Sequence, residues 1–283
     1  MTTLPRPGRS GLERLCKRQG DRIAVASGAP GIERLEAHLH GQAFAPHRHD
    51  TYAIGITLSG TQTFRFRGER WHCLPGQCHI LHPDEAHDGA AATGAGFRYR
   101  IVYFDPALVQ QALGGRPLPF VSHPVVDGSR VPQPLAAEIW DFGGGTLGDQ
   151  RRTELAVAVA ELLDGLAARP VQRPGALALD RLRCVRDLIA VAPNRRLSTT
   201  ELERISGLDR WTLARQFSAA FGTSPSRFRT MRQLDRVRRL LASGTSLAEC
   251  AIEAGFADQS HMSRHFKRAY GLTPAAWARA TGR

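Results

Sequence analysis

The sequence predicts an α+β protein of two domains, in which a small antiparallel β-barrel or jelly roll precedes an all-helical domain. The first observation is a change of hydrophobic period. Residues 31–126 form short alternating runs broken by Gly and Pro, whereas the chain after residue 130 follows a helical period. The second is the charge, because residues 176–283 carry 19 Lys+Arg against 9 Asp+Glu in a chain of formal net charge +12. A basic second domain indicates a polyanionic partner.

The composition is that of a globular protein, and its 283 residues suffice for two domains with separate cores. No run approaches the roughly 18 apolar residues of a spanning helix, and the opening MTTLPRPGRSGLERLCKRQG has no apolar core like that of a secretory signal. Five cysteines without a C-x-x-C pair favour reduced thiols over a disulfide or zinc framework. We therefore expect a cytoplasmic protein whose residues 1–30 form an N-terminal arm.

Short strands are predicted throughout residues 31–126. In AIGITL, Ile54 and Ile56 alternate with small residues, as in a half-buried strand. SGTQTFRFRGE places Phe64 and Phe66 on one face and arginines on the other. WHCLPGQCHILHPDEAH turns at its Pro-Gly pair before a new strand, and FRYRIVYFDP closes the series. Such short strands between Gly/Pro turns are typical of a small barrel or jelly roll.

Residues 127–175 predict a helical segment between the domains. In RTELAVAVAELLDGLAARP, residues 152–170, apolar side chains recur every three or four positions, at Leu155, Val159, Leu162, Leu163 and Leu166. This stripe either packs on its own domain or forms a dimer seam, and we favour the dimer seam. FGGGTLG, residues 142–148, and PVQRPG, residues 170–175, predict flexible joints.

The remaining residues contain two copies of one helix–turn–helix layout. In the first copy, Ser198 and Glu201 predict a capping box, and Asp209 caps a second helix beyond a glycine. The second copy, SLAECAIEAGFADQSHMSRHF, ends a short helix at Gly255 and caps a longer one at Asp258. SPSRFRTMRQLDRVRRLLASG predicts a long amphipathic helix between them. In a helix-turn-helix the second helix enters the DNA major groove.

Residues 177–278 resemble the DNA-binding domain of the AraC/XylS family of bacterial transcription regulators. The resemblance rests on LARQFSAAFGTSPSRF and on AIEAGFADQSHMSRHFKRAYGLTPAAW, which is close to the family signature. It implies that residues 176–283 are a DNA-binding domain whose two units read successive major grooves. The residues matched to the reading positions are Arg210, Trp211, Ala214, Arg215, Gln259, Ser260, Ser263 and Arg264.

The chemistry of these side chains suits base recognition. Arg215 or Arg264 could form bidentate hydrogen bonds with a guanine, and Gln259 could do so with an adenine. Ala214 stands where a longer polar residue is common in the family, so contact with a thymine methyl is expected there. We expect Trp211 to be exposed, because the buried stripe of its helix is formed by other residues. His261 and His265 are expected to pack or to contact phosphate.

The first domain resembles the cupin family through GQAFAPHRHDTYAIG and GERWHCLPGQCHILHPDEAH. His47 and His49 match the H-x-H of the first cupin motif, and His79 approximates the histidine of the second. The glutamate of metal-binding cupins is replaced by Ala53 or Ile54, so one protein ligand is missing. A three-histidine metal site at His47, His49 and His79 stays an alternative.

The same region resembles the cupin-like sensor domain of the AraC/XylS family, which implies a metal-free site for a small effector. We therefore predict an effector pocket at His47, His49, Tyr52, His79 and His87, with purely structural histidines as a further alternative. His82 is three positions from His79 and falls on the opposite strand face, so we do not expect the two to pair.

These observations predict a DNA-binding transcription regulator that responds to a small polar or anionic effector, such as an amino acid. We expect a homodimer acting with RNA polymerase on promoter DNA, with no membrane association and no cofactor. We expect an activator, although the sign depends on where its site lies relative to a promoter. No P-loop, dinucleotide fingerprint or nucleophile elbow predicts an enzyme. The alternatives are a metal-dependent cupin oxygenase or isomerase with a DNA-binding tail, and a ligand-independent DNA-binding protein.

Overall fold

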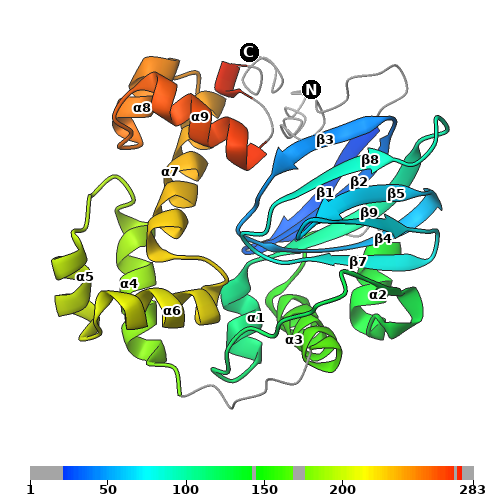
Figure 1. Cartoon of the computed structure of the whole chain (residues 1–283), viewed down its shortest axis with the longest axis horizontal. Helices are drawn as coiled ribbons and strands as arrows, with labels where there is room; N and C mark the ends of the chain where they lie inside the picture. The colour runs from blue at the N-terminus through cyan, green and yellow to red at the C-terminus, as the bar shows by residue number, and fades with distance from the viewer. Residues whose placement is uncertain (1–21, 142–144, 168–175, 271–272, 276–283) are drawn as a thin grey trace, which may run out of the picture.

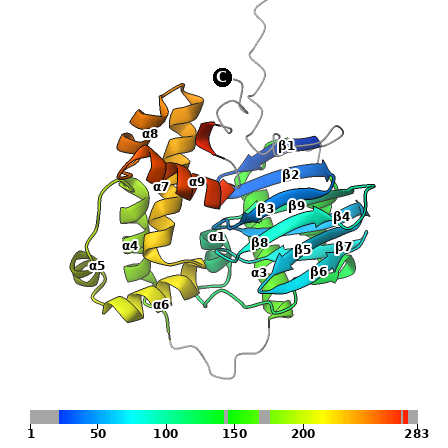
Figure 2. The ribbon, with the colours of Figure 1, turned by 45° about the horizontal axis from the view of Figure 1, so that its top comes forward.

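The computed structural model describes residues 22–141, 145–167, 176–270 and 273–275, which form a β-sandwich domain and a helical domain side by side (Figures 1 and 2). None of the helices in these ranges is both long enough and apolar enough to cross a membrane. Cys73, Cys78, Cys184 and Cys250 are free thiols, and Cys16 lies outside the described residues. The predicted joint at 170–175 and most of the predicted N-terminal arm also lie outside them.

The sandwich is built from two antiparallel sheets. The larger has the strand order β1-β2-β9-β4-β7-β10, and the smaller has the order β3-β8-β5-β6. The strands are β1 (Arg22–Ala29), β2 (Ile32–Leu39), β3 (Gln42–His47), β4 (Tyr52–Gly60), β5 (Gln62–Phe66), β6 (Glu69–Cys73), β7 (Gln77–Leu81), β8 (His87–Ala91), β9 (Phe97–Phe104) and β10 (Val125–Asp127). The sheet begins earlier than predicted, because residues 22–29 pair with β2 instead of forming an arm.

The core between the sheets follows strand alternation. Phe64 and Phe66 lie on one face of β5, as predicted, and this face points inward, where each side chain is 1% exposed. Central strand β4 differs from the prediction, because it is buried on both faces instead of one. Ile54 and Ile56 pack with helices outside the larger sheet, whereas Ala53 belongs to the core between the sheets. The expectation of a half-buried strand therefore missed the helical layer.

Three helices supply that layer: α1 (Pro106–Ala112), α2 (Gln133–Trp140) and α3 (Asp149–Leu166). The apolar stripe of α3 is buried against the outer face of the larger sheet, with Leu155 and Val159 both fully buried. This corrects the predicted dimer seam, because the side chains proposed for it already pack within their own domain. A buried ion pair between Arg34 of β2 and Glu138 fixes α2 on the same face.

The helical domain contains α4 (Leu179–Val191), α5 (Thr199–Ser206), α6 (Arg210–Phe221), α7 (Pro225–Ala242), α8 (Leu247–Glu253) and α9 (Gln259–Tyr270). Helices α5–α6 and α8–α9 are the two helix-turn-helix units, and α7 runs between them (Figure 1). The predicted capping box of Ser198 with Glu201 is present at the start of α5, and Ser246 with Glu249 forms a second one at the start of α8. Gln233 of α7 donates hydrogen bonds to two carbonyl oxygens in the turn after α8, which fixes the second unit on the long helix.

The two domains are joined by polar contacts. The backbone nitrogen of Leu118 donates to the carbonyl oxygen of Ala219 in α6 at 2.8 Å. The Thr223 hydroxyl donates to Asp84 at 3.1 Å. Arg232 of α7 forms an ion pair with Asp50 of the sandwich. The helical domain is therefore attached to the sandwich through α6 and α7.

Candidate functional site: an interdomain pocket and two reading helices

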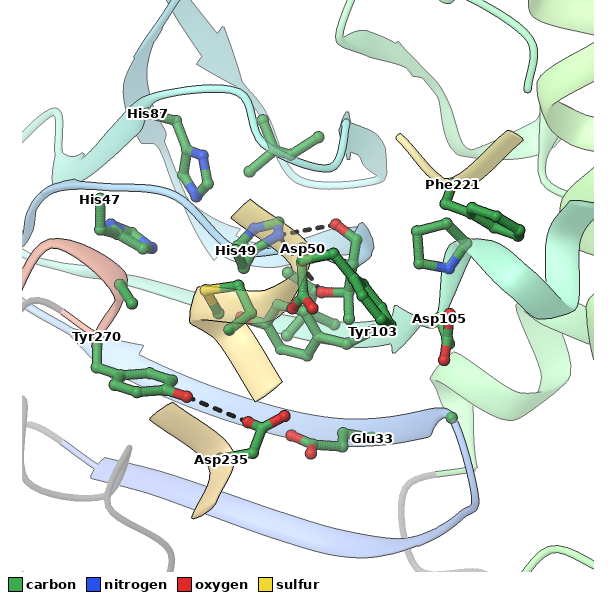
Figure 3. Close-up of a pocket in the computed structure, with 18 of the residues that line it drawn as sticks. Glu33, His47, His49, Asp50, His87, Tyr103, Asp105, Phe221, Asp235 and Tyr270 are labelled. Carbon is green, nitrogen blue, oxygen red and sulfur yellow. Dashed lines mark hydrogen bonds between the residues drawn. The ribbon is translucent and has the colours of Figure 1, made fainter. Parts of the chain in front are cut away.

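The sandwich and the helical domain together enclose a cavity of about 510 Å³ (Figure 3). The sandwich domain contributes residues from β2, β3, β5, β7, β8 and β9 and from the loop after β3. The helical domain contributes Arg186 of α4, residues from α7, and the last residues of α6 and α9. Cavities of this size commonly hold small ligands, and a ligand here would contact both domains.

Three imidazoles form what we call the histidine cluster, which comprises His47, His49 and His87. The ring centroid of His87 lies 4.3 Å from that of His47 and 4.7 Å from that of His49. His47 and His49 flank the end of β3, and His87 begins β8, which pairs with β3. The H-x-H spacing and the pairing of these two strands therefore bring the rings together.

Each ring of the histidine cluster uses Nδ1 for a backbone hydrogen bond. The carbonyl partners are Ala45 for His47 at 2.9 Å, Thr51 for His49 at 2.8 Å, and Glu85 for His87 at 3.0 Å. A carbonyl oxygen has no proton to give, so each Nδ1 is the donor. In a neutral imidazole this leaves Nε2 as a hydrogen-bond acceptor.

Burial keeps these imidazoles neutral near pH 7. It lowers the pKa of His49 to about 3 and that of His79 to about 4. Burial also lowers the pKa of His47, and that of His87 well below its usual value, where the neighbouring imidazoles add to the effect. The pocket therefore presents neutral histidines rather than imidazolium cations.

A second group, which we call the acidic rim, comprises Glu33, Asp50, Asp105 and Asp235, and all four line the cavity. Arg232 bridges Asp50 and Asp235, the latter at 3.1 Å. The hydroxyl of Tyr270 donates to Asp235 at 3.2 Å (Figure 3). Burial raises the pKa of Asp50 to about 6, although Arg232 acts in the opposite direction. Arg232 thus joins one carboxylate of the sandwich, Asp50, to one of the helical domain, Asp235.

The predicted effector residues are mostly brought together, with one correction. His47, His49, His79 and His87 line the cavity, whereas Tyr52 does not. Tyr52 faces the helical layer outside the larger sheet, where its ring lies 5.3 Å from that of His82. His82, as expected, does not pair with His79, since its Nε2 accepts from the backbone nitrogen of Val121 at 3.2 Å.

The alternative metal site is not assembled as predicted. His87, and not His79, lies against His47 and His49. In the part of the chain that the structure describes, no three His, Cys, Asp or Glu side chains are arranged to hold a metal ion. His79 instead lies between the sheets, 0% exposed, near Phe64 and Tyr99.

Sequence reasoning missed most of the residues that line the pocket. The residues it did not name include Gln62, Tyr99 and Tyr103 from the sandwich and Arg232, Arg238 and Tyr270 from the helical domain. Inward positions on β5 and β9 could have been found from strand alternation. The residues of the helical domain carried no such signal, because only the docking of the two domains brings them to the cavity.

The predicted reading positions lie on α6 and α9. Arg210, Trp211 and Arg215 are exposed on α6, and Trp211 is 71% exposed with the Arg210 guanidinium over its ring. Gln259, Ser260 and Arg264 are exposed on α9, while Ala214 and Ser263 are half-buried. Off this face, Nε2 of His265 lies 3.0 Å from Nε2 of His261. Six of the eight predicted reading residues are thus exposed on the surfaces of the two helices.

Two family models match the chain. The AraC-like ligand binding domain matches residues 29–182, and a helix-turn-helix domain matches residues 202–280. The HTH-type transcriptional regulator YbfI of Bacillus subtilis is 24% identical over 247 residues, which cover 81% of this chain and 88% of that protein. The HTH-type transcriptional regulator RipA of Corynebacterium glutamicum is 32% identical over 97 residues, which cover 34% of this chain and 29% of that protein.

Solved structures of ToxT from Vibrio cholerae share the fold. ToxT bound to (E)-4-(8-methylnaphthalen-1-yl)but-3-enoic acid superposes with a TM-score of 0.60 at 10% identity, covering 89% of this chain and 99% of that one. ToxT bound to an unsaturated fatty acid gives a TM-score of 0.56 at 11% identity, covering 94% of this chain and 98% of that one. The likeness extends over both domains.

Proposed function

Because the chain belongs to the AraC family of helix-turn-helix transcription regulators, we propose that a small polar effector in the interdomain pocket controls how α6 and α9 engage promoter DNA. One observation carries this proposal: the final residue of each reading helix, Phe221 or Tyr270, lines the cavity. An effector would therefore touch the ends of both helices that read DNA. It would favour one arrangement of the two domains over another.

In this proposal the effector sites are His47, His49, His79 and His87, together with the acidic rim. The DNA contacts are the exposed positions of α6 and α9, with Arg215 and Arg264 as the candidates for guanine recognition. An amino acid is one effector of suitable size and polarity. The protein would act in the cytoplasm as a homodimer with RNA polymerase, through a surface other than the buried stripe of α3.

The DNA half of the proposal is tested with the full chain. Selection from random duplexes should yield a preferred sequence, bound roughly 10³-fold or more tightly than random DNA at physiological salt. Arg264→Ala should lower that preference, whereas Lys267→Ala on the same helix should weaken preferred and random DNA alike. Equal binding of selected and random duplexes by the unmodified protein would contradict the proposal.

The effector half is tested by linkage. A thermal-shift screen of amino acids and organic acids identifies compounds that stabilise the folded protein. A true effector must change DNA affinity by the same factor by which DNA changes the affinity for the effector. Titration calorimetry with and without the selected duplex measures both factors. A pocket ligand for which both factors equal one would not be an effector.

A further inference from the structure

The polar groups that the sandwich domain turns toward the cavity are mainly hydrogen-bond acceptors. The Nε2 atoms of the histidine cluster accept, because Nδ1 of each ring is already the donor to a backbone carbonyl. Glu33, Asp50 and Asp105 add carboxylates from the same domain. The arginines that line the cavity are Arg186, Arg232 and Arg238, and all three belong to the helical domain.

Two further side chains that line the same cavity have buried polar atoms without a hydrogen-bond partner among the described residues. His79 is 0% exposed, and neither of its ring nitrogens has a hydrogen-bond partner among the described residues. Gln62 is 5% exposed, and its Oε1 also has none. An unmade hydrogen bond of a buried polar group is unfavourable, so these side chains point to a ligand that satisfies them.

The position of His79 depends on its neighbour in the larger sheet. Gly55 of β4 pairs with His79 of β7. A Cβ at Gly55 would lie 2.4 Å from Cε1 of His79 and 2.7 Å from its Nε2, which is closer than atoms can pack. A side-chain-free residue at position 55 therefore leaves the imidazole space to face the cavity.

The chemistry of a ligand follows from this array. A hydroxyl group is uncharged, so it gains nothing from the negative charge of the acidic rim. An ammonium or guanidinium group has only donors and carries the positive charge that the acidic rim favours. Tyr103, whose ring lies 5.5 Å from that of His49, supplies an aromatic wall of the kind that accommodates organic cations.

We propose that the effector binds through a protonated nitrogen, which the histidine cluster and the carboxylates of Glu33 and Asp50 hold. This inference rests on the proposed function, because it concerns the same pocket. The nitrogen competes with Arg232 for Asp50, and Arg232 is the α7 side chain that joins the reading domain to that carboxylate. A cationic ligand therefore loosens this interdomain ion pair by taking the place of the Arg232 guanidinium beside Asp50.

The test uses two sets of compounds that differ only in their charged groups. One set is phenylalanine, phenethylamine and 3-phenylpropanoate, and the other is norleucine, pentylamine and hexanoate. Each compound is titrated calorimetrically into the full-length protein. In at least one set we expect the amine to bind 10-fold or more tightly than the matched acid. Tighter binding of the acids, or no binding of either amine, would overturn the inference.

Variants locate the binding site. Glu33→Gln and Asp50→Asn should each weaken binding of the amine by about 10-fold or more, since each removes a charged acceptor. The control Glu69→Gln alters an exposed carboxylate on β6 outside the cavity and should leave the affinity unchanged. Equal weakening by all three, or by none, would contradict the assignment. Thermal unfolding of each variant verifies that it is folded.

A separate readout follows His79 by NMR of histidine-labelled protein, with the His79 signal assigned from a His79→Phe variant. The bound amine should shift the ring signals of the histidine cluster, and Gly55→Ala should move the His79 signal without any ligand. An acid that changes DNA binding while the histidine signals stay fixed would refute the inference and leave the proposed function intact. An amine that shifts the histidine signals without changing DNA binding would refute the proposed control of DNA binding by the pocket. It would leave the binding of amines in the pocket supported.

Discussion

The two helix-turn-helix units share one plan and are attached to the sandwich in different ways. Helices α6 and α9 each have 12 residues and end in an aromatic residue at the cavity. The attachments of the first unit, Leu118 to Ala219 and Asp84 to Thr223, lie outside the cavity lining. Beside the second unit, the interdomain ion pair of Asp50 with Arg232 lies within the cavity lining, as does the hydrogen bond inside the helical domain that Tyr270 of α9 donates to Asp235 of α7.

This difference indicates which unit a ligand would reach first. A molecule in the cavity can compete directly for the ion pair and the hydroxyl hydrogen bond beside α9. Among the described residues of α5 and α6, Phe221 lines the cavity, beneath the guanidinium of Arg186, whereas the polar contacts of this unit with the sandwich lie elsewhere. We therefore expect a ligand to leave the contacts of the first unit with the sandwich intact and to weaken those beside the second unit.

The largest expected effect tests whether the two units are separately stable. Phe217→Ala and Phe266→Ala each remove a fully buried aromatic ring, at a cost of about 3–5 kcal/mol. The two rings belong to separate apolar clusters. Hydrogen exchange should therefore show loss of protection in the mutated unit and little change in the other. Loss of protection in both units from either substitution would show that they unfold together.

The next effect concerns the charged attachment beside the second unit. Because burial raises the pKa of Asp50 from its usual value near 4 to about 6, the folded protein holds this proton more tightly than the unfolded chain. Its contribution to stability is therefore present below about pH 4 and is lost as the pH rises through 6, by up to about 3 kcal/mol. Denaturant unfolding at several pH values measures it. Asp50→Asn should flatten the profile in this window, and an unchanged profile would contradict the pKa assignment.

The reading residues provide a paired test of the same comparison. Arg264→Ala and Arg215→Ala should each weaken binding to the preferred DNA by about 1–3 kcal/mol and relax one base position. Dissociation constants for duplexes that vary at each base pair would identify the base position that each arginine reads. If our comparison holds, the pocket ligand should alter the contribution of Arg264 more than that of Arg215. An equal change at both would mean that the ligand moves the helical domain as one body.

The smallest expected effect is at the helix starts. Ser198→Ala and Ser246→Ala each remove a capping box and should cost about 1 kcal/mol. Thermal unfolding measures the loss, with Ser218→Ala on the exposed side of α6 as the matched control. Because the two caps are alike, their costs should be alike. A much larger loss at Ser246 would indicate that the second unit is the weaker one.

Much of the helical domain could be predicted from the sequence, because its signals are local. Ser198, Asp209 and Ser224 cap their helices by contacts within three residues, and the alternation around Phe64 likewise identifies a strand face. The face of Tyr52 could not be predicted, since a central strand covered by helices is apolar on both sides. The pairing of Asp50 with Arg232 joins residues 182 positions apart and depends on how the domains dock.

Because both domains line the cavity, neither domain can be exchanged for that of a relative without altering the cavity. Arg186, Arg232 and Arg238 belong to the helix-turn-helix domain, yet they line the interdomain cavity. In a chimaera of this sandwich with the helical domain of a relative, the residues that the helical domain contributes to the cavity would be replaced. The DNA preference would change at the same time. Engineering a new biosensor from this scaffold therefore requires those three arginine positions to be transplanted back with the sandwich.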